Sequence, residues 1–134
     1  MKRKDVDEFE KLCGQLQSTY HELSALSKKS PNDAVNTFKL KFVNRLLNQS
    51  NSLLGDKYRP FDDFFEFDTD DVPKNSDAVF MLSQYIECFE KFRADSIIYK
   101  SGWKWVVDAE EGEKGDEQGF VYIETIVPKR LRYK

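Results

Sequence analysis

The chain of 134 residues lacks long hydrophobic runs. A membrane-spanning helix needs roughly 18 or more consecutive apolar residues, and no stretch approaches that length, so such a helix is excluded. Residues 1–8 include three bases but lack the apolar core of a signal peptide. We therefore expect a cytoplasmic protein that has no membrane partner.

Cysteine and histidine are also scarce, with two Cys and one His in the chain. Cys13 and Cys88 fall on the apolar faces of expected helices, where buried thiols in a reducing compartment are expected. A disulfide between these helices would require an oxidising compartment. A four-ligand zinc site lacks its usual CxxC or HxxxH spacing.

Common catalytic and phosphate-binding motifs are missing as well. The sequence contains no GxSxG, GxxxxGKS/T or GxGxxG motif. A single histidine leaves little room for a Ser–His–Asp triad. We therefore expect a protein that is not an enzyme and that has no catalytic residue, cofactor or metal ion.

Large aromatic side chains and unevenly placed charges are what the sequence does have. Eleven Phe, six Tyr and two Trp bury much area per residue, which suits one domain over residues 1–134. Residues 62–71 carry six acids and no base, and residues 108–117 carry six acids and one base. The rest of the chain holds 20 bases against 12 acids, although the net charge is -3. This separation of charge favours oriented association with another macromolecule.

Apolar residues that recur at three- and four-residue steps predict three helices: residues 4–28, 31–54 and 76–96. Ser30 and Pro31 predict the start of the second helix, and Gly55 predicts its end. The apolar residues of this helix spread over about 200° at about 100° per residue, which predicts a central helix packed on two sides. The residues that we expect to be almost fully buried are Phe42, Leu46, Leu82 and Phe89.

The apolar period changes to two after Gly102. This change predicts strands over residues 103–108 and 120–127, joined by an acidic loop that contains glycine. Residues 97–99 either extend the third helix or add a short third strand. The expected fold is α+β and mainly α: an antiparallel three-helix bundle with a C-terminal β-hairpin packed on it.

The Phe–Asp segment, residues 61–68, lies between the second and third helices. Its candidate partner-binding residues are Phe61, Asp62, Asp63, Phe64, Phe65, Glu66, Phe67 and Asp68. In one interpretation the rings fill a groove between helices while the acids face water. In the other, the rings anchor a partner protein and the carboxylates steer its basic surface. A cation site at Asp68, Asp70 and Asp71 lacks the glycine and distal Glu of an EF-hand loop.

The C-terminal tail is basic, and its candidate nucleic-acid contacts are Lys129, Arg130, Arg132 and Lys134. These bases either belong to a solvated end or one folded back on an acidic loop, or they contact phosphates together with residues 2–4. Trp103 and Trp105 either stack on nucleic-acid bases or, as we expect, hold the hairpin in the core.

Taken together, the charge pattern and the missing motifs favour a small protein-interaction module: an adaptor, an inhibitor or immunity-type protein, or a subunit of a larger assembly. The expected partner is another protein. The alternative is a nucleic-acid-binding accessory protein that uses the basic body and the C-terminal tail.

Overall fold

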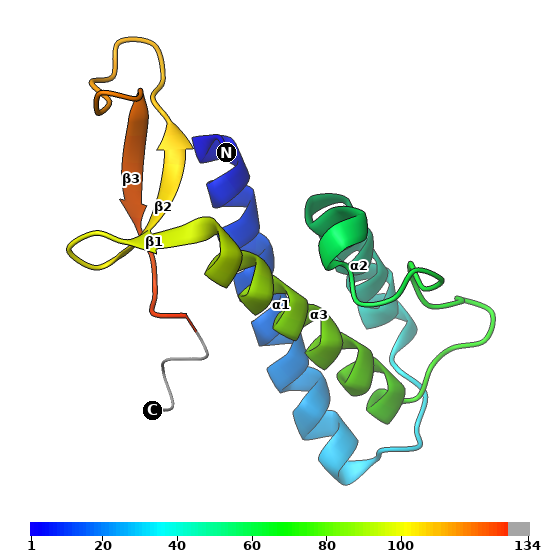
Figure 1. Ribbon diagram of the computed structural model, residues 1–134. Coiled ribbons are helices and arrows are strands. Elements are labelled where there is room, and N and C mark those ends of the chain that lie inside the picture. The colour runs from blue at the N-terminus through cyan, green and yellow to red at the C-terminus, as the bar shows by residue number, and fades with distance from the viewer. Residues whose placement is uncertain (129–134) are drawn as a thin grey trace. The chain divides into compact units, whose positions relative to one another are not determined.

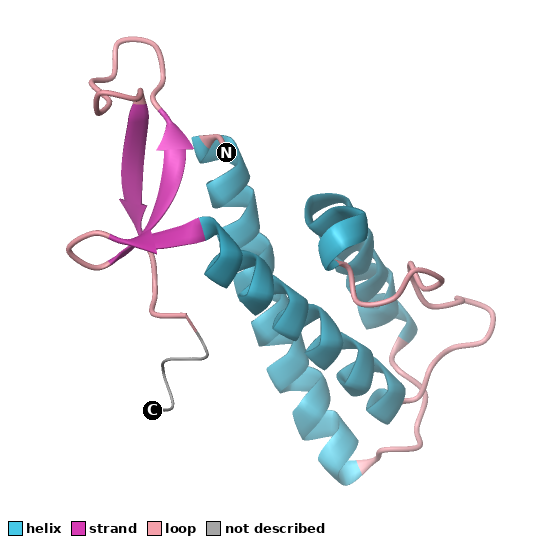
Figure 2. Ribbon diagram, viewed as in Figure 1, coloured by secondary structure: helices cyan, strands magenta, loops and turns pink. Residues whose placement is uncertain are grey.

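The computed structural model describes residues 1–128, and these form three helices and a small sheet (Figures 1 and 2). The elements are α1 (Arg3–Lys29), α2 (Thr37–Tyr58), α3 (Asn75–Ser96), β1 (Ile97–Tyr99), β2 (Trp103–Asp108) and β3 (Phe120–Glu124). The expected α+β class, mainly helical with strands near the C-terminus, is confirmed. In the described part of the chain, no helix combines the length and the apolar character that crossing a membrane requires.

Contacts along the chain group its residues into two compact units. The helical unit is Lys11–Phe89, and the strand unit combines Met1–Glu10 with the chain from Glu90 onward. Helices α1 and α3 each contribute residues to both units. The interpretation of the whole chain as one domain stays a prediction.

Within the helical unit, α2 and α3 begin side by side, as a bridge between Ala34 and Lys74 shows. The side chain of Asn75 donates a hydrogen bond to Ser30 O at 3.0 Å, which places the start of α3 at the end of α1. Helix α1 therefore runs antiparallel to α2 and α3, as predicted for the bundle. Helices α2 and α3 run in the same direction (Figure 1). Residues 59–74 carry the chain back along α2.

Helix α2 begins at Thr37, six residues after the predicted start. Asn36 is the cap, because its side chain accepts a hydrogen bond from Lys39 N at 3.1 Å. Residues 33–35 do not join the helix, since their backbone groups hydrogen-bond to residues 73–75 instead. The local signal at Ser30 and Pro31 was outweighed by contacts to a distant part of the chain.

Helix α2 packs on one side rather than two. Its buried apolar residues are Leu40, Val43, Leu46, Leu47 and Leu54. Leu46, Leu82 and Phe89 are buried as expected, but the prediction for Phe42 is wrong, because its side chain is 39% exposed. At about 100° per residue, Phe42 lies on the side of α2 opposite Leu47. The wide apolar arc therefore combines a core side with an exposed side.

Gly55 interrupts α2, as its sequence position predicted. Its φ of 67° lies in the left-handed region, which glycine adopts without the strain that a side chain would add. One further turn ends at Tyr58, and the N–H of Arg59 donates to Gly55 O at 3.1 Å. This turn directs the chain from α2 into the Phe–Asp segment.

The sheet is antiparallel in the order β1-β2-β3, with Trp105 paired to Ile97 on one side and to Ile123 on the other. The predicted hairpin is confirmed as β2 and β3. Strand β1 is the short third strand that stood as the alternative to a longer helix. Strand β3 ends at Glu124, which pairs with Lys104, rather than at residue 127; the last contact of this edge is the hydrogen bond that Thr125 N donates to Trp103 O at 3.0 Å.

Trp105 fixes the sheet to the helix ends inside the strand unit. It is fully buried and contacts Phe9 edge to face, with ring centroids 5.0 Å apart. Arg93, only 2% exposed, lies 5.0 Å above the Phe9 ring and pairs with the Glu10 carboxylate. Trp105 Nε1 donates to the same carboxylate at 3.1 Å. Because an unpaired buried guanidinium is costly, this ion pair ties α1, α3 and the sheet together.

Candidate protein-docking site

The Phe–Asp segment is fastened to α2 by asparagine side chains. Asn44 forms a reciprocal pair with Phe67: its Nδ2 donates to Phe67 O, and its Oδ1 accepts from Phe67 N, each at 2.9 Å. Asn51 Nδ2 donates to Phe65 O at 3.0 Å. The segment forms neither helix nor strand, so these side chains supply hydrogen bonds that regular structure would otherwise provide.

The prediction from sequence did not include the asparagines that anchor the segment, although their spacing in the sequence indicates them. Asn44, Asn48 and Asn51 recur at four- and three-residue steps, so they line one side of α2. Asn is unfavourable in a helix interior, and its repetition there indicates a hydrogen-bonding role. Asn51 Oδ1 also accepts from the Tyr85 hydroxyl at 2.7 Å. Burial raises the pKa of Tyr85, which keeps this hydroxyl a donor.

The four Phe rings of the segment differ in exposure: three fit the interpretation of packing against the protein, and one fits the interpretation of anchoring a partner. Phe61, Phe64 and Phe67 are half-buried, and the Phe64 and Phe67 rings meet edge to face with centroids 5.2 Å apart. Phe65 is 48% exposed and lies 5.0 Å from the guanidinium carbon of Arg59. Three rings are therefore partly buried, two of them in contact with each other, and Phe65 is presented at the surface.

The acids of the segment all face solvent: Asp62, Asp63, Glu66 and Asp68. Asp62 lies 4.0 Å from Arg59 Nε, and Glu66 accepts a hydrogen bond from Asn48 at 3.1 Å. Asp63 has no hydrogen-bond or ion-pair partner within residues 1–128. The segment thus presents carboxylates beside one exposed aromatic ring.

Of the other candidate residues, the structure describes only those within residues 1–128. Lys129, Arg130, Arg132 and Lys134 lie outside the described residues. Among residues 1–128, no three His, Cys, Asp or Glu side chains converge as a metal site would require. Asp68 instead accepts a hydrogen bond from the N–H of Asp70 at 2.8 Å, which forms a local turn. Trp105 belongs to the core, and Trp103 is half-buried.

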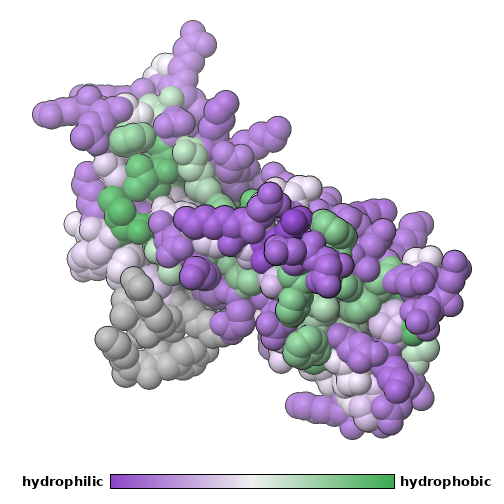
Figure 3. Space-filling model, turned by 45° about the vertical axis from the view of Figure 1, so that its right-hand side comes forward, coloured by the Kyte–Doolittle hydropathy of each residue, from purple (hydrophilic) through white to green (hydrophobic). Residues whose placement is uncertain are grey.

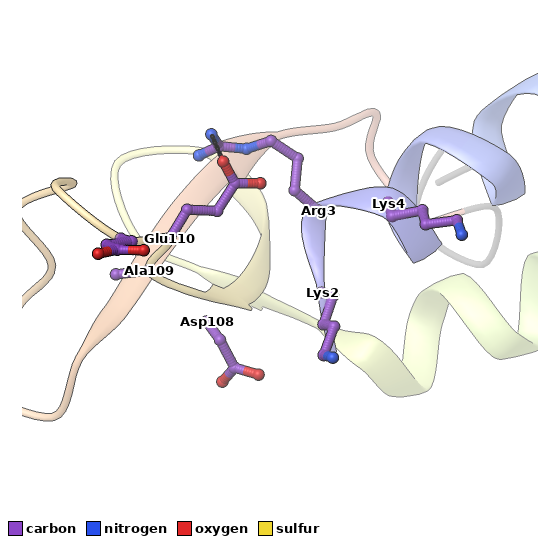
Figure 4. A pocket seen from close by; sticks show the side chains of 7 residues that line it. Lys2, Arg3, Lys4, Asp108, Ala109 and Glu110 are labelled. Carbon is purple, nitrogen blue, oxygen red and sulfur yellow. Dashed lines mark ion pairs between the residues drawn. The ribbon is translucent and has the colours of Figure 1, made fainter.

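A pocket of about 310 Å³ lies beside the start of α1 in the strand unit (Figure 4). The residues that line it are Lys2, Arg3, Lys4, Asp108, Ala109, Glu110 and Glu111. Arg3 donates to Glu113 at 2.7 Å and lies 3.9 Å from Glu110, and the hydrogen bond to Glu113 raises the pKa of Arg3. Figure 4 shows the Lys4 side chain directed away from these acids. Because bases and acids neutralise one another here, the pocket favours neither anions nor cations.

Asp116 organises the acidic loop, residues 109–119. Its carboxylate accepts hydrogen bonds from the N–H groups of Gln118 and Phe120, each at 2.9 Å, and from the Tyr122 hydroxyl. The Tyr122 hydroxyl, followed by these amides, lowers the pKa of Asp116. The Asp116 carboxylate in turn raises the pKa of Tyr122. The acids of this loop therefore hold its own conformation.

The visible face in Figure 3 is mostly hydrophilic, and its hydrophobic residues form separate groups. Such a face suits small mixed contacts that combine a few apolar anchors with charge. Comparison with known protein families, curated protein sequences and solved structures finds no match to the chain. The geometry of the Phe–Asp segment is therefore what indicates a function.

Proposed function

We propose that the chain is a small, non-enzymatic, cytoplasmic protein-interaction module whose Phe–Asp segment docks a basic surface of a partner protein. It would act as an adaptor, an inhibitor or immunity-type protein, or a subunit of a larger assembly. The observation that carries the proposal is that uncharged asparagine side chains of α2 anchor the segment. Asn44 and Asn51 hold its backbone, so the Asp62 and Asp63 carboxylates are not required to hold the loop.

The chemistry of the segment suits a partner that is basic and has an apolar recess. Phe65 offers an exposed ring as an anchor, and buried aromatic anchors supply much of the energy of protein interfaces. The exposed carboxylates would accelerate encounter with a basic surface. Because the segment is already fastened, little conformational freedom remains to be lost on binding.

The test compares two variants that remove the same charge from different acidic segments. Asp62→Asn/Asp63→Asn neutralises the Phe–Asp segment, and Glu111→Gln/Glu117→Gln neutralises two exposed acids of the acidic loop. A partner captured from native lysate is identified by mass spectrometry, purified and titrated against each variant. We expect the first variant to bind about tenfold more weakly, mainly through slower association, and the second to bind like the wild type. Equal affinity for both variants would reject the segment as the docking site.

Nuclease treatment separates the alternative function from the proposed one. A protein partner retained after nuclease treatment supports the interaction module. If nuclease removes every partner, and replacement of Lys129, Arg130, Arg132 and Lys134 by Ala flattens the salt dependence of binding, the nucleic-acid-binding accessory protein takes its place. A thermal melt of each variant confirms that the fold is intact.

A further inference from the structure

The outer side of α2 carries two exposed aromatic rings. Phe38 is 69% exposed and Phe42 is 39% exposed. The two residues lie one helical turn apart, and their rings meet edge to face with centroids 5.1 Å apart. Neither ring contributes to the buried side of α2, so the chain keeps this apolar area in water.

Two exposed cations lie on the same side of the helix. At about 100° per residue, Lys41 and Arg45 lie together on one flank of the two rings, and the guanidinium carbon of Arg45 lies 5.0 Å from the Phe42 ring centroid. Residues 37–55 contain three bases and no acid. We name Phe38, Lys41, Phe42 and Arg45 the α2 outer face.

We infer that the α2 outer face binds an acidic amphipathic helix of a partner protein. Its four residues lie within about 11 Å along the helix axis, which matches about two turns of a second helix. Helix recognition commonly uses apolar anchors spaced one turn apart, as Phe38 and Phe42 are. Carboxylates along one flank of the apolar stripe of the incoming helix would meet Lys41 and Arg45, which no described acid pairs with.

The same contacts disfavour single-stranded nucleic acid as the occupant. A base needs an open ring face on which to stack, whereas Arg45 covers one face of Phe42 and Phe38 meets its ring. Two unpaired cations provide few phosphate contacts. The exposed acids of the Phe–Asp segment, which is hydrogen-bonded to α2, would repel a phosphate backbone.

A second copy of this chain fits the α2 outer face less well than an acidic helix. In a two-fold symmetric pairing, the same patch meets itself, so Lys41 and Arg45 would approach their own counterparts. The inference is also independent of the proposed docking by the Phe–Asp segment, because it concerns other residues and a partner of opposite charge.

The experiment is a selection from a displayed library of 18-residue amphipathic helical peptides whose positions beside the apolar stripe vary between Glu, Gln and Lys. The bait is the full chain, and the enriched peptides are synthesised and titrated by fluorescence anisotropy. The test variant is Phe38→Ser/Phe42→Ser, and Phe80→Ser, which replaces a 56% exposed ring on α3, is the matched control. Thermal melts of all variants verify folding.

We expect enrichment of Glu-flanked peptides whose affinity falls about tenfold or more in Phe38→Ser/Phe42→Ser and is unchanged in Phe80→Ser. Lys41→Gln/Arg45→Gln should weaken binding and reduce its salt dependence. Enrichment without Glu, no enrichment, or equal binding by the double-Ser variant would overturn the inference. Concentration-dependent dimerisation that the double-Ser variant abolishes would assign the face to a second copy. Binding of a single-stranded RNA oligonucleotide that depends on Phe38 and Phe42, without binding of acidic peptides, would assign the face to nucleic acid.

Discussion

The two acidic segments of this protein carry the same number of acids, but different side chains hold each of them in place. Residues 62–71 and residues 108–117 each carry six acids. In the acidic loop, carboxylates make the contacts that hold the chain: Asp116 accepts three hydrogen bonds, and Glu113 pairs with Arg3. In the Phe–Asp segment, neutral Asn44 and Asn51 hold the backbone.

The number of charges in a segment therefore does not reveal whether those charges hold the loop or face a partner. Where carboxylates satisfy the loop's own N–H groups, they are internal acceptors and have less capacity left for a partner. Where amides from a neighbouring helix satisfy the backbone, the carboxylates remain at the surface. Substitutions in the two segments, and in the side chains that hold them, test this contrast.

Asn44→Ala should be the most destabilising of these changes. It removes two hydrogen bonds and leaves the N–H and C=O of Phe67 without their partner in a part-buried setting. The expected loss in free energy of unfolding is about 2–3 kcal/mol, measured by urea denaturation. Asn48→Ala, at an exposed position of the same stripe, is the control and should cost about 0.5 kcal/mol or less. Equal losses would show that the Asn44 pair does not hold the segment.

The sequence predicted those parts of the fold that depend on local patterns. The 3.6-residue period located all three helices, the two-residue period located β2 and β3, and Gly55 marked the break in α2. What it missed depends on distant contacts. The start of α2 is displaced to Thr37 because Ala34 bridges to Lys74, and no local cap signal near Ser30 contains that information.

The candidate site was predictable in its residues but not in its construction. The density of Phe and acids identified residues 61–68, whereas the hydrogen bonds from Asn44 and Asn51 became visible only in three dimensions. Phe42 and Leu47 are both apolar, so a hydropathy pattern does not distinguish them. The pattern does not show which of two apolar sides of a helix packs against the rest of the protein. That ambiguity produced the wrong expectation of a helix packed on two sides.

Acidification should loosen the acidic loop before it affects the anchoring of the Phe–Asp segment. Because the folded pKa of Asp116 is lowered, its stabilising contribution is present above the ordinary aspartate pKa and is lost as the pH falls through the folded value. The raised pKa of Tyr122 makes its contribution present below the ordinary tyrosine pKa and lost as the pH rises through the folded value. The Tyr122–Asp116 bond should therefore persist across the neutral range.

Hydrogen exchange at the amides of Gln118 and Phe120 measures this loosening. Asp116→Asn should lower their protection factors at neutral pH and remove the loss of protection on acidification, because the amide side chain does not titrate. The N–H of Phe67, whose acceptor is the uncharged Asn44, provides the internal control. Its protection from exchange should show no such loss on acidification. An acid transition of equal size at Phe67 would contradict the contrast between the two segments.

Arg3→Gln should produce a smaller and only partial change. The N–H of Glu110 is the main cause of the lowered pKa of Glu113, and the Arg3 guanidinium is the second. Removing the guanidinium should therefore raise the pKa of Glu113 partway toward its ordinary value, as NMR titration of that carboxyl would report. A complete return to the ordinary value would mean that the N–H contact contributes nothing.

The smallest effect on folding is expected from Asp62→Asn/Asp63→Asn. The Asp62 side chain is 93% exposed and only 4.0 Å from Arg59, and an exposed ion pair of that kind adds little stability. The matched variant Glu113→Gln/Asp116→Asn removes the same charge but weakens the acceptors on which the acidic loop depends. The first variant should keep the wild-type urea midpoint and the exchange rate of Phe67 N–H, while the second should speed exchange at Gln118 and Phe120. If the first variant instead released Phe67, the acids of the Phe–Asp segment would hold its conformation as those of the acidic loop do, and they would no longer be surplus to folding.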